Sequence, residues 1–397
     1  MVKQVEQWTE IRAADFIEFN PRMSIKKGTI ATKVAMDKLQ PFTKKIPDSE
    51  KASFSGGSKF RNGDTIMARI TPCLENGKTA FVDILGKAEV AFGSTEFIVM
   101  RAREGISDPQ FIYYLATSPW FRNIAIKSMV GSSGRQRVQQ SVLDDLVLNV
   151  PPLEEQKKIS SFLCVLDQKI ALNNEINDNL EQQVQAYFQE LFVDNADPAW
   201  TLGTISDLGT VVGGSTPSKS KPEYYTEDGI AWITPKDLSI NKAKFISHGE
   251  NDITELGLKN SSASIMPEGT VLFSSRAPIG YIAIASGEVT TNQGFKSVVP
   301  KPEIGTAYVY CFLKHNLPVI EGMASGSTFK EVSGSTMKNV PAVIPDTETL
   351  TCFNDFCAPI FAHQRILEEQ NQSLAALRDS LLPKLMSGEI DVSAIQL

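Results

Sequence analysis

PPLEEQKKISSFLCVLDQKIALNNEINDNLEQQVQAYFQELF, residues 151–192, predicts one long helix. From Ile159 onward, mainly apolar residues recur at alternating intervals of four and three, which is typical of a helix that packs along a narrow stripe on another helix. No Gly or Pro follows Pro152 in this stretch. At ~1.5 Å per residue, the helix should span roughly 60 Å and separate other parts of the chain. The predicted seam positions are Ile159, Leu163, Leu166, Ile170, Asn173, Asn177, Leu180, Val184, Tyr187 and Leu191.

A second copy of this pattern closes the chain, 194 residues further on. Pro359 lies within the copy, so we expect the regular helix to begin or bend there. Asn177 and Asn371 are equivalent seam positions. We expect them to pair and to fix an antiparallel register, with simple exposure to solvent as the alternative. The second seam consists of Phe353, Cys357, Ile360, Gln364, Leu367, Asn371, Leu374, Arg378, Leu381 and Leu385.

A globular segment precedes each helix, and the same offset relates Val150 to Ile344 and Pro151 to Pro345. The repeat predicts an α+β protein with a pseudo-twofold internal repeat, in which two similar mixed α/β domains are joined by two long antiparallel helices packed as a coiled coil. The expected boundaries are 1–150 for the first domain, 151–195 for the central helix, 196–345 for the second domain, and 346–397 for the last helix and tail.

Short β-like runs and turns fill the two globular segments. In the first, we expect strands at 64–69, 79–85, 96–100 and 146–150, and a helix over 109–128 with a break at Ser118-Pro119. In the second, residues 229–238 predict a strand that leads into a turn.

Composition excludes several classes of protein. The chain has no apolar run of the ~18 residues that a membrane span requires and no apolar core of a signal peptide near its first residue, so we expect a cytoplasmic protein with no membrane association. Its 5 Cys and 3 His show no metal-ligand spacing, which disfavours disulfides and a metal site. No catalytic residue is predicted: the G-x-S-x-G motif is absent, and residues 209–216 have P-loop spacing but Ser215 in place of the required Lys.

The net charge of -7 is typical of an acidic cytosolic enzyme rather than of a nucleic-acid binder. The charge is unevenly distributed, however: residues 1–150 contain 21 Lys and Arg against 16 Asp and Glu, whereas the helical segments 151–195 and 346–397 each contain 3 against 8. A basic local surface is what attracts phosphates. Residues 22–61, with 10 Lys and Arg against 3 acidic residues, are therefore a candidate DNA footprint.

Four sequence stretches together resemble a known family. They are PPLEEQKKI at 151–159, LLPKLMSGEI at 381–390, GGSTPS at 213–218 followed by WITPKDL at 232–238, and LFSSRAPIG at 272–280. In this order, the chain resembles the DNA-specificity (S) subunit of type I restriction-modification systems along nearly its whole length.

This resemblance implies two target-recognition domains, each of which reads half of a bipartite, asymmetric site in double-stranded DNA. It implies two methyltransferase (modification) subunits as partners, which bring S-adenosylmethionine for DNA methylation, and restriction (motor) subunits, which bring ATP and Mg. The specificity subunit is not catalytic in this family, and no cofactor is expected in this chain. A protein-interaction adaptor that does not bind DNA is the alternative.

The candidate DNA contacts are polar and basic residues in predicted loops and at strand ends, because Lys and Arg bind phosphates, Arg pairs with guanine, and Asn and Gln pair with adenine. Each could instead be a solvated turn or strand cap, and Trp232 and Tyr224 are expected in the core rather than on bases. In the first half the candidates are Arg69, Thr71, Asn76, Lys78, Arg135 and Arg137. In the second half they are Ser215, Thr216, Lys219, Lys221, Thr234, Lys236, Ser275, Arg276, Asn292, Gln293 and Lys330.

Overall fold

The computed structural model describes residues 8–132, 134–326 and 330–392. The chain forms two compact units. Unit 1 consists of Met1–Ala171 and Gln372–Leu397, and unit 2 consists of Leu172–Asn371. Unit 1 is thus assembled from both ends of the sequence, and both long helices contribute residues to each unit.

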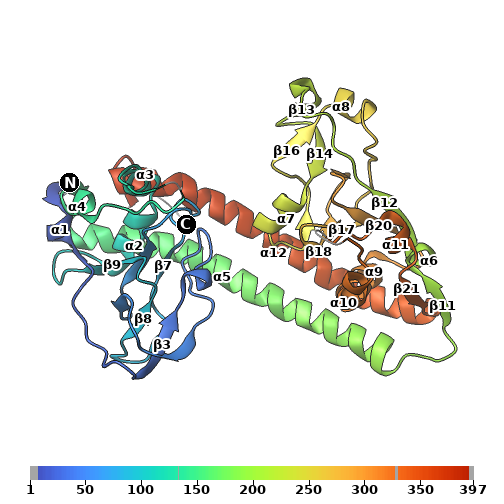
Figure 1. The fold of residues 1–397 in the computed structure, drawn as a ribbon, viewed down its shortest axis with the longest axis horizontal. Coiled ribbons are helices and arrows are strands. Elements are labelled where there is room, and N and C mark those ends of the chain that lie inside the picture. Colours follow the sequence, from blue (N-terminus) through green and yellow to red (C-terminus); the bar gives the residue numbers. More distant parts are fainter. Residues whose placement is uncertain (1–7, 133, 327–329, 393–397) are drawn as a thin grey trace, which may run out of the picture. The chain divides into compact units, whose positions relative to one another are not determined.

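The two predicted long helices are present. α5 (Leu153–Gln189) has 37 residues and continues as a π-helical segment, η2 (Glu190–Asp194), while α12 (Thr347–Ser387) has 41 residues (Figure 1). Of the two alternatives expected at Pro359, a start of the regular helix is wrong, since α12 starts 12 residues earlier and passes through it. Pro359 and Asp355 are both exposed. Water can therefore reach the Asp355 carbonyl, which loses its helical donor at the proline.

Within each unit, the helices pack in an antiparallel sense. In unit 1, Leu163 near the start of α5 shares a hydrophobic core with Leu385 near the end of α12. In unit 2 the opposite ends meet, and the Phe188 ring lies 5.9 Å from the Phe353 ring. The predicted seam positions are largely removed from solvent: Ile159, Leu163, Leu166, Val184, Leu367 and Leu385 are buried, and Ile170, Leu180, Leu191, Ile360, Leu374 and Leu381 are half-buried.

The predicted pairing of Asn177 with Asn371 is wrong. Asn371 accepts a hydrogen bond from Asn173 (2.9 Å) and donates one to Asn174 (2.7 Å), whereas the Asn177 carbonyl accepts from Gln364 (3.1 Å). As one antiparallel helix advances, the facing positions on the other recede. Pairs of residues separated by the same 194 positions can therefore lie opposite each other at only one point along the two helices. Asn177 and Asn371 are not the pair at that point.

The described residues of unit 1 form two four-stranded sheets and one two-stranded sheet (Figure 1). The first sheet has the order β2 (Ile17–Phe19), β9 (Phe97–Ala102), β6 (Thr65–Ala68) and β7 (Thr79–Phe81). The second has the order β4 (Glu50–Ser53), β3 (Ile30–Val34), β8 (Ala91–Gly93) and β5 (Lys59–Phe60). β1 (Thr9–Arg12) pairs antiparallel with β10 (Val147–Val150), and the shorter helices are α1 (Ala13–Phe16), η1 (Met36–Lys38), α2 (Pro109–Thr117), α3 (Pro119–Lys127) and α4 (Gln140–Asp144).

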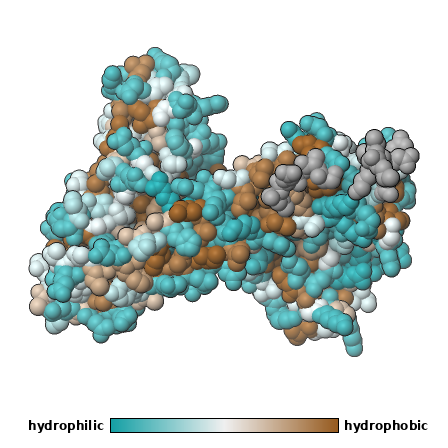
Figure 2. All heavy atoms as spheres, turned by 180° about the vertical axis from the view of Figure 1, so that it is seen from behind, coloured by the Kyte–Doolittle hydropathy of each residue, from teal (hydrophilic) through white to brown (hydrophobic). Residues whose placement is uncertain are grey.

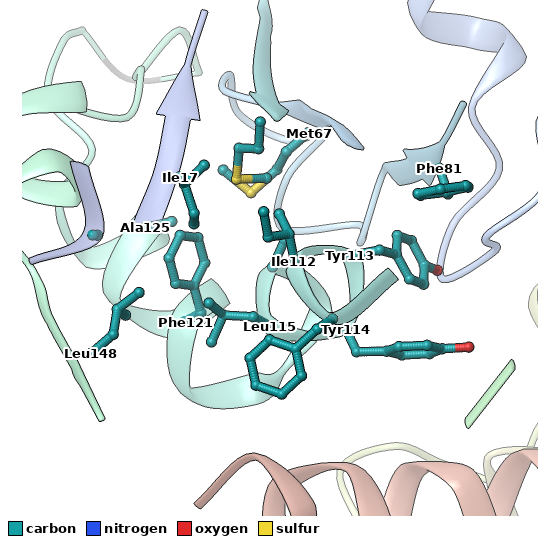
Figure 3. Packing of buried hydrophobic residues seen from close by; sticks show 14 of the residues in the cluster. Ile17, Met67, Phe81, Ile112, Tyr113, Tyr114, Leu115, Phe121, Ala125 and Leu148 are labelled. Carbon is teal, nitrogen blue, oxygen red and sulfur yellow. The ribbon is translucent and has the colours of Figure 1, made fainter. Parts of the chain in front are cut away.

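The core of unit 1 lies between its first sheet and the long helices. Figure 3 shows Ile17 and Met67 from the sheet facing Ile112 and Phe121 from α2 and α3. The predicted break between α2 and α3 is confirmed, because the Ser118 side chain accepts a hydrogen bond from the Phe121 amide and caps α3.

The described residues of unit 2 repeat this plan with one more strand in one of the sheets. A five-stranded sheet has the order β12 (Gly209–Gly213), β20 (Lys296–Pro300), β17 (Val271–Ser275), β18 (Ile279–Ala285) and β15 (Phe245–Ile246). A four-stranded sheet has the order β13 (Tyr225–Thr226), β16 (Asn251–Ile253), β14 (Ile230–Ile233) and β19 (Thr290–Thr291). β11 (Thr201–Thr204) pairs with β21 (Pro341–Ile344), and the helices are α6 (Ile205–Leu208), η3 (Pro222–Tyr224), α7 (Pro235–Ile240), α8 (Glu255–Lys259), α9 (Thr306–His315), α10 (Leu317–Gly322) and α11 (Gly334–Lys338).

The turn predicted at the end of residues 229–238 is instead the helix α7. Thr234 caps it: its hydroxyl oxygen accepts from the Asp237 amide, and the Asp237 carboxylate accepts from the Thr234 amide (2.7 Å). This reciprocal arrangement is a capping box. Nowhere in the part of the chain that the structure describes is a helix long and apolar enough to cross a membrane.

Candidate nucleic-acid interface

Each unit has a loop whose ends are joined by an isolated β-bridge. We call the loop of unit 1 loop A; its ends are joined where Val130 pairs with Arg137. We call the loop of unit 2 loop B; its ends are joined where Ser325 pairs with Glu331. Residue 133 of loop A and residues 327–329 of loop B lie outside the described residues. Candidate DNA contacts from distant parts of the sequence gather at the bases of both loops.

In unit 1, Arg69 and Arg137 meet around a carboxylate that was not among the candidates. Arg137 Nε and Nη2 donate to the Glu96 carboxylate at 2.7–3.0 Å, and Arg69 Nε lies 3.9 Å from Glu96 Oε2. Thr71 contacts the same loop, because its amide donates to the Gln136 carbonyl (3.0 Å). Arg135 is exposed on loop A. Loop A thus brings together four of the six candidates of unit 1.

Glu96 is held in its charged form by this arrangement. The hydrogen bonds from Arg137 lower the pKa of the Glu96 carboxyl, partial burial opposes them, and the charges of Arg137 and Arg69 lower it further. The same hydrogen bonds raise the pKa of the Arg137 guanidinium. The three groups carry a net charge of about +1.

The other two candidates of unit 1 do not gather at loop A by any contact among the described residues. Lys78 Nζ donates to the Met36 carbonyl (3.0 Å), which supports the chain before β4. Asn76 is exposed in a turn, where its amide donates to the Pro72 carbonyl (2.9 Å). For Lys78, the alternative of a structural role fits the geometry better.

In unit 2, two loops that are remote in the sequence form one polar surface. The Ser215 amide donates to the Thr291 carbonyl (2.8 Å), and the Thr216 hydroxyl donates to the Gln293 side-chain oxygen. Asn292 accepts from the Gly294 amide (2.8 Å). Ser215, Thr216, Asn292 and Gln293 therefore lie together, as four of the candidates.

Trp232 supports this surface from below. The residue is 6% exposed, and its indole nitrogen donates to the Ser215 carbonyl (3.0 Å). This confirms that Trp232 is a core residue. Its role at the site is to position the loop rather than to stack on a base.

Arg276 and Lys296 face the acidic end of loop B. Arg276 Nη1 lies 3.5 Å from Glu331 Oε2, and Lys296 Nζ lies 3.9 Å from Glu331 Oε1. Partial burial lowers the pKa of Lys296, and Glu331 partly offsets this effect. Lys296 was also not among the candidates, and Glu331, like Glu96, was missed from sequence because carboxylates were not sought at a DNA-binding site. The 194-residue offset, which aligns Glu331 with Arg137, is a signal that could have found this position.

The structure removes Ser275 from the candidates and weakens three others. Ser275 is fully buried inside the sheet, and its hydroxyl donates to the Gly294 carbonyl (3.0 Å), so it cannot reach a base. The Thr234 hydroxyl is used in capping α7, Lys236 pairs with Glu250 (2.5 Å), and Lys221 lies 3.6 Å from Glu223. Lys219 and Lys330 are exposed.

The basic stretch at residues 22–61 is more neutral than its composition indicates. Lys33 pairs with Glu50 (2.7 Å), Lys51 pairs with Glu89 (2.8 Å), and Lys38 pairs with Asp48. Lys44 points inward, where its ammonium lies 3.1 Å from the Tyr114 hydroxyl. Near the start of this stretch, Arg22, Lys26 and Lys27 are exposed.

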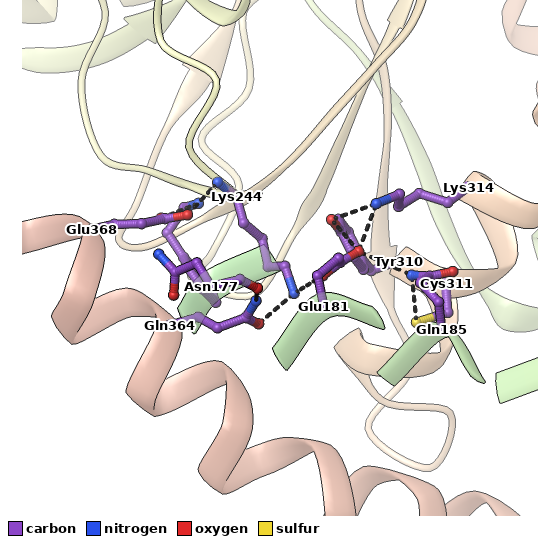
Figure 4. A network of polar contacts seen from close by, with 10 residues as sticks. Asn177, Glu181, Gln185, Lys244, Tyr310, Cys311, Lys314, Gln364 and Glu368 are labelled. Atoms are coloured by element: carbon purple, nitrogen blue, oxygen red, sulfur yellow. Dashed lines mark hydrogen bonds and ion pairs between the residues drawn. The ribbon is translucent and has the colours of Figure 1, made fainter. Parts of the chain in front are cut away.

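A buried charge network connects the domain of unit 2 to its share of the long helices (Figure 4). Lys244, from the segment between α7 and β15, forms an ion pair with Glu181 of α5 and a hydrogen bond with Gln364 of α12 (2.6 Å). Its backbone amide donates to Glu368 of α12 (2.7 Å). The network fixes the domain on the helices. In the described ranges, no group of three or more His, Cys, Asp or Glu could hold a metal ion.

The chain is similar to proteins of one kind along most of its length. Residues 6–182 and 199–370 both match the family described as "Type I restriction modification DNA specificity domain". The chain is 40% identical over 191 residues to the type I restriction enzyme MjaIX specificity subunit of Methanocaldococcus jannaschii, a match that covers 46% of this chain and 44% of that relative. It therefore spans less than half the length of that relative.

Two further comparisons cover more of the chain. The type I restriction enzyme HindI specificity subunit of Haemophilus influenzae is 26% identical over 411 aligned residues, which cover 83% of this chain and 87% of the relative. The crystal structure of a type I restriction-modification system S subunit from M. genitalium covers 97% of both chains at a TM-score of 0.58 and 14% identity. This last likeness shows a shared fold.

Proposed function

Because the chain belongs to the family of type I restriction modification DNA specificity domains, we propose that it is the DNA-specificity subunit of a type I restriction-modification complex. In this role, each unit reads one half of a bipartite, asymmetric site in double-stranded DNA. The chain is the non-catalytic member of the complex, and it selects the sequence on which other subunits act.

The observation that carries the proposal is that two units share one backbone frame but present different side chains at equivalent places. Arg69 in unit 1 and Ser275 in unit 2 make equivalent backbone hydrogen bonds. In each unit, one bond goes to the turn that precedes a neighbouring strand and one to the residue that follows loop A or loop B. The surfaces around them differ, with Arg69, Arg135 and Arg137 in one unit and Thr216, Arg276 and Gln293 in the other. Two unlike polar surfaces on one frame suit the reading of two unlike half-sites.

Partner subunits supply the chemistry in this proposal. Two methyltransferase subunits would bring S-adenosylmethionine, and restriction subunits would bring ATP and Mg. Support for docking on the long helices comes from their exposed apolar side chains, because such side chains favour protein contact over solvent. Figure 2 shows brown areas among the teal ones on one face of the molecule. The exposed apolar residues of α5 and α12 include Val165, Leu172, Phe356, Ile366 and Leu377.

The adaptor alternative predicts a different response to salt. A chain that binds duplex DNA through Lys and Arg releases counterions, so its affinity falls steeply as salt concentration rises, with a slope of roughly -0.9 per phosphate neutralised. An adaptor that recognises only protein has no such dependence on DNA. The family match favours the DNA-binding role.

Methylome sequencing of a host with and without this gene tests the proposal most directly. We expect a split motif that is methylated only when the gene is present, because the specificity subunit determines where its methyltransferase partners act. An identical set of methylated motifs in both strains, with the methyltransferase gene expressed, would refute the proposed function.

A further inference from the structure

The bases of loop A and loop B are structurally equivalent. The Arg69 amide donates to the Glu96 carbonyl (2.9 Å), and its carbonyl accepts from the Val138 amide (2.8 Å). The Ser275 amide donates to the Gly294 carbonyl (2.7 Å), and its carbonyl accepts from the Val332 amide (2.9 Å). Glu96 thus corresponds to Gly294, and Arg69 corresponds to Ser275.

The charged residues at these two places come from different positions of the shared frame. In unit 1 the loop end supplies a cation, Arg137, and the strand turn supplies the carboxylate, Glu96. In unit 2 the loop end supplies the carboxylate, Glu331, and the cations come from Arg276 and Lys296. Both units arrive at one carboxylate between two cations, although the equivalent loop-end position holds a cation, Arg137, in unit 1 and a carboxylate, Glu331, in unit 2.

The cations remain available for a ligand. The side chains of Arg137 and Arg276 are 45% and 38% exposed, against 23% for Glu96. Glu96 occupies the Nε and Nη2 edge of Arg137. Among the described residues, no hydrogen bond is donated by Nη1 of Arg137, so the end of this guanidinium is open.

A carboxylate in this place affects two DNA ligands unequally. A backbone phosphate is an anion, so Glu96 or Glu331 repels it at the distance where an arginine would bind it. The O6 and N7 atoms of guanine are uncharged acceptors. A guanidinium that is paired with a carboxylate can still donate two hydrogen bonds to them. The carboxylate therefore disfavours phosphate more than it disfavours a base edge.

We propose that Glu96 and Glu331 are specificity-determining positioning residues, which orient Arg137 and Arg276 toward a guanine edge and keep them from binding phosphates. This inference rests on the proposed function and deepens it. It assigns a guanine contact to each half-site and a repulsive element to each unit, and such an element is a general means of obtaining specificity.

The test uses the full-length chain assembled with its methyltransferase partner, and compares Glu96→Gln and Glu331→Gln with the wild type. The probes are the split duplex identified by methylome sequencing, the same duplex with either half scrambled, and an unrelated duplex. We expect Glu96→Gln to bind the unrelated duplex about three to ten times more tightly and to steepen its salt slope by about one, because one cation becomes free for phosphate. Discrimination by unit 1 at its own half-site should fall about tenfold, and Glu331→Gln should do the same at the other half-site.

Matched controls separate this effect from loss of an ion pair in general. Asp145→Asn removes the carboxylate of the pair with Arg12 in unit 1, and Glu268→Gln removes that of the pair with Arg365 in unit 2. Both should leave the binding ratios unchanged, and Glu96→Asp, which restores the charge, should recover much of the ratio that Glu96→Gln loses.

Two outcomes would overturn the inference alone: equal weakening of all duplexes by Glu96→Gln and Glu331→Gln, which a purely structural role predicts, or binding ratios that match those of the controls. A wild-type complex that prefers no duplex would instead overturn the proposed function, and the inference with it.

Discussion

Lys244 brings a charge to the buried contact between the domain of unit 2 and its helices. Its side chain is 6% exposed and pairs with Glu181, which also accepts from Lys314 (2.6 Å). Replacing Lys244 with Met would leave Glu181 buried with one partner fewer. We expect this variant to lose about 3 kcal/mol of unfolding free energy in unit 2, measured by hydrogen exchange of the α9 amides.

Lys242→Met is the matched control for this prediction. Lys242 is an exposed neighbour on the same segment, with its ammonium 4.5 Å from the centroid of the Tyr281 ring. Its replacement should change the unfolding free energy by less than about 1 kcal/mol. Equal stability of the two variants would show that the buried ion pair does not support unit 2.

The same carboxylate predicts a pH dependence. Burial raises the pKa of Glu181, but the charges and hydrogen bonds of Lys244 and Lys314 outweigh it and bring this pKa to about 2. A carboxyl with a lowered folded-state pKa stabilises the protein above its unfolded pKa of about 4.3, and this contribution is lost as the pH falls toward 2. Thermal unfolding from pH 6 to pH 2.5 should therefore show a smaller decline in midpoint for Glu181→Gln than for the wild type, and parallel declines would contradict the prediction.

Individual contacts were the hardest feature to predict. Arg69 and Arg137 were candidates because Arg binds DNA, yet their carboxylate partner Glu96 lies 27 and 41 residues away in sequence. Ser275 was a candidate as a polar residue at the end of a β-like run, but its place inside β17 buries it completely. Local sequence shows which side chains are polar, whereas the partner of each depends on which distant strands pair.

The middle of the helix pair contains a layer of Asn side chains in a mainly apolar seam. Asn173 is fully buried, and within the described ranges its Oδ1 atom has no hydrogen-bond partner. We expect Asn173→Leu to raise the thermal midpoint of unit 2, with a gain of about 1 kcal/mol, because a buried polar seam residue fixes register at a cost in stability. The exposed Asn179→Leu is the control, and a lower midpoint for Asn173→Leu would show that the Asn layer is stabilising.

Pro359 gives a second prediction for α12. The residue is exposed and interrupts the hydrogen bonding of a continuous helix. Pro359→Ala should raise the unfolding free energy of unit 2 by about 1–3 kcal/mol, since Ala supplies the missing donor and has the better helix propensity. Chemical denaturation measures the change, and a lower stability would mean that the proline fixes a bend that the packing of α12 requires.

Sequence periodicity identified helices and strands better than it identified their partners. The heptad seam predicted both long helices, and Ser118-Pro119 correctly predicted the break between α2 and α3. The Asn register was wrong because a repeat offset compares homologous positions, whereas an antiparallel pair brings together positions that run in opposite directions. α7 was predicted as a turn, although Pro235 lies in its first helical turn, a position that suits proline.

The internal repeat was predictable because both copies retain the same apolar spacing and turn residues. The division of the chain into units was harder to foresee, since the boundaries fall after Ala171 and after Asn371, inside the two long helices. A boundary inside a continuous helix leaves no Gly-rich or Pro-rich linker in the sequence.

Lengthening both helices tests whether they determine the spacing of the two half-sites. One heptad inserted after Ala171 and one after Asn371 would add about 10 Å to each helix while keeping the seam in phase. Under the proposed function, we expect the methylated motif to gain about three base pairs between its halves, at 3.4 Å per step along each strand. The control carries the heptad in α5 alone, which puts the two helices out of step and should abolish methylation. An unchanged motif in the protein with both insertions would refute the prediction.

Unit 1 is completed by the last stretch of the chain: Leu382 and Leu385 of α12 belong to its core, and Trp8 lies against Gly388. Unit 2, Leu172–Asn371, is continuous in sequence. During synthesis on the ribosome, unit 1 therefore cannot complete its core until residues beyond Asn371 have been translated. All residues of unit 2 have been translated once Asn371 is added. A premature stop after Asn371 would leave unit 2 complete and unit 1 without its last helical segment. In nascent chains arrested near that codon, unit 2 should therefore be protected from protease before unit 1, although unit 1 is translated first.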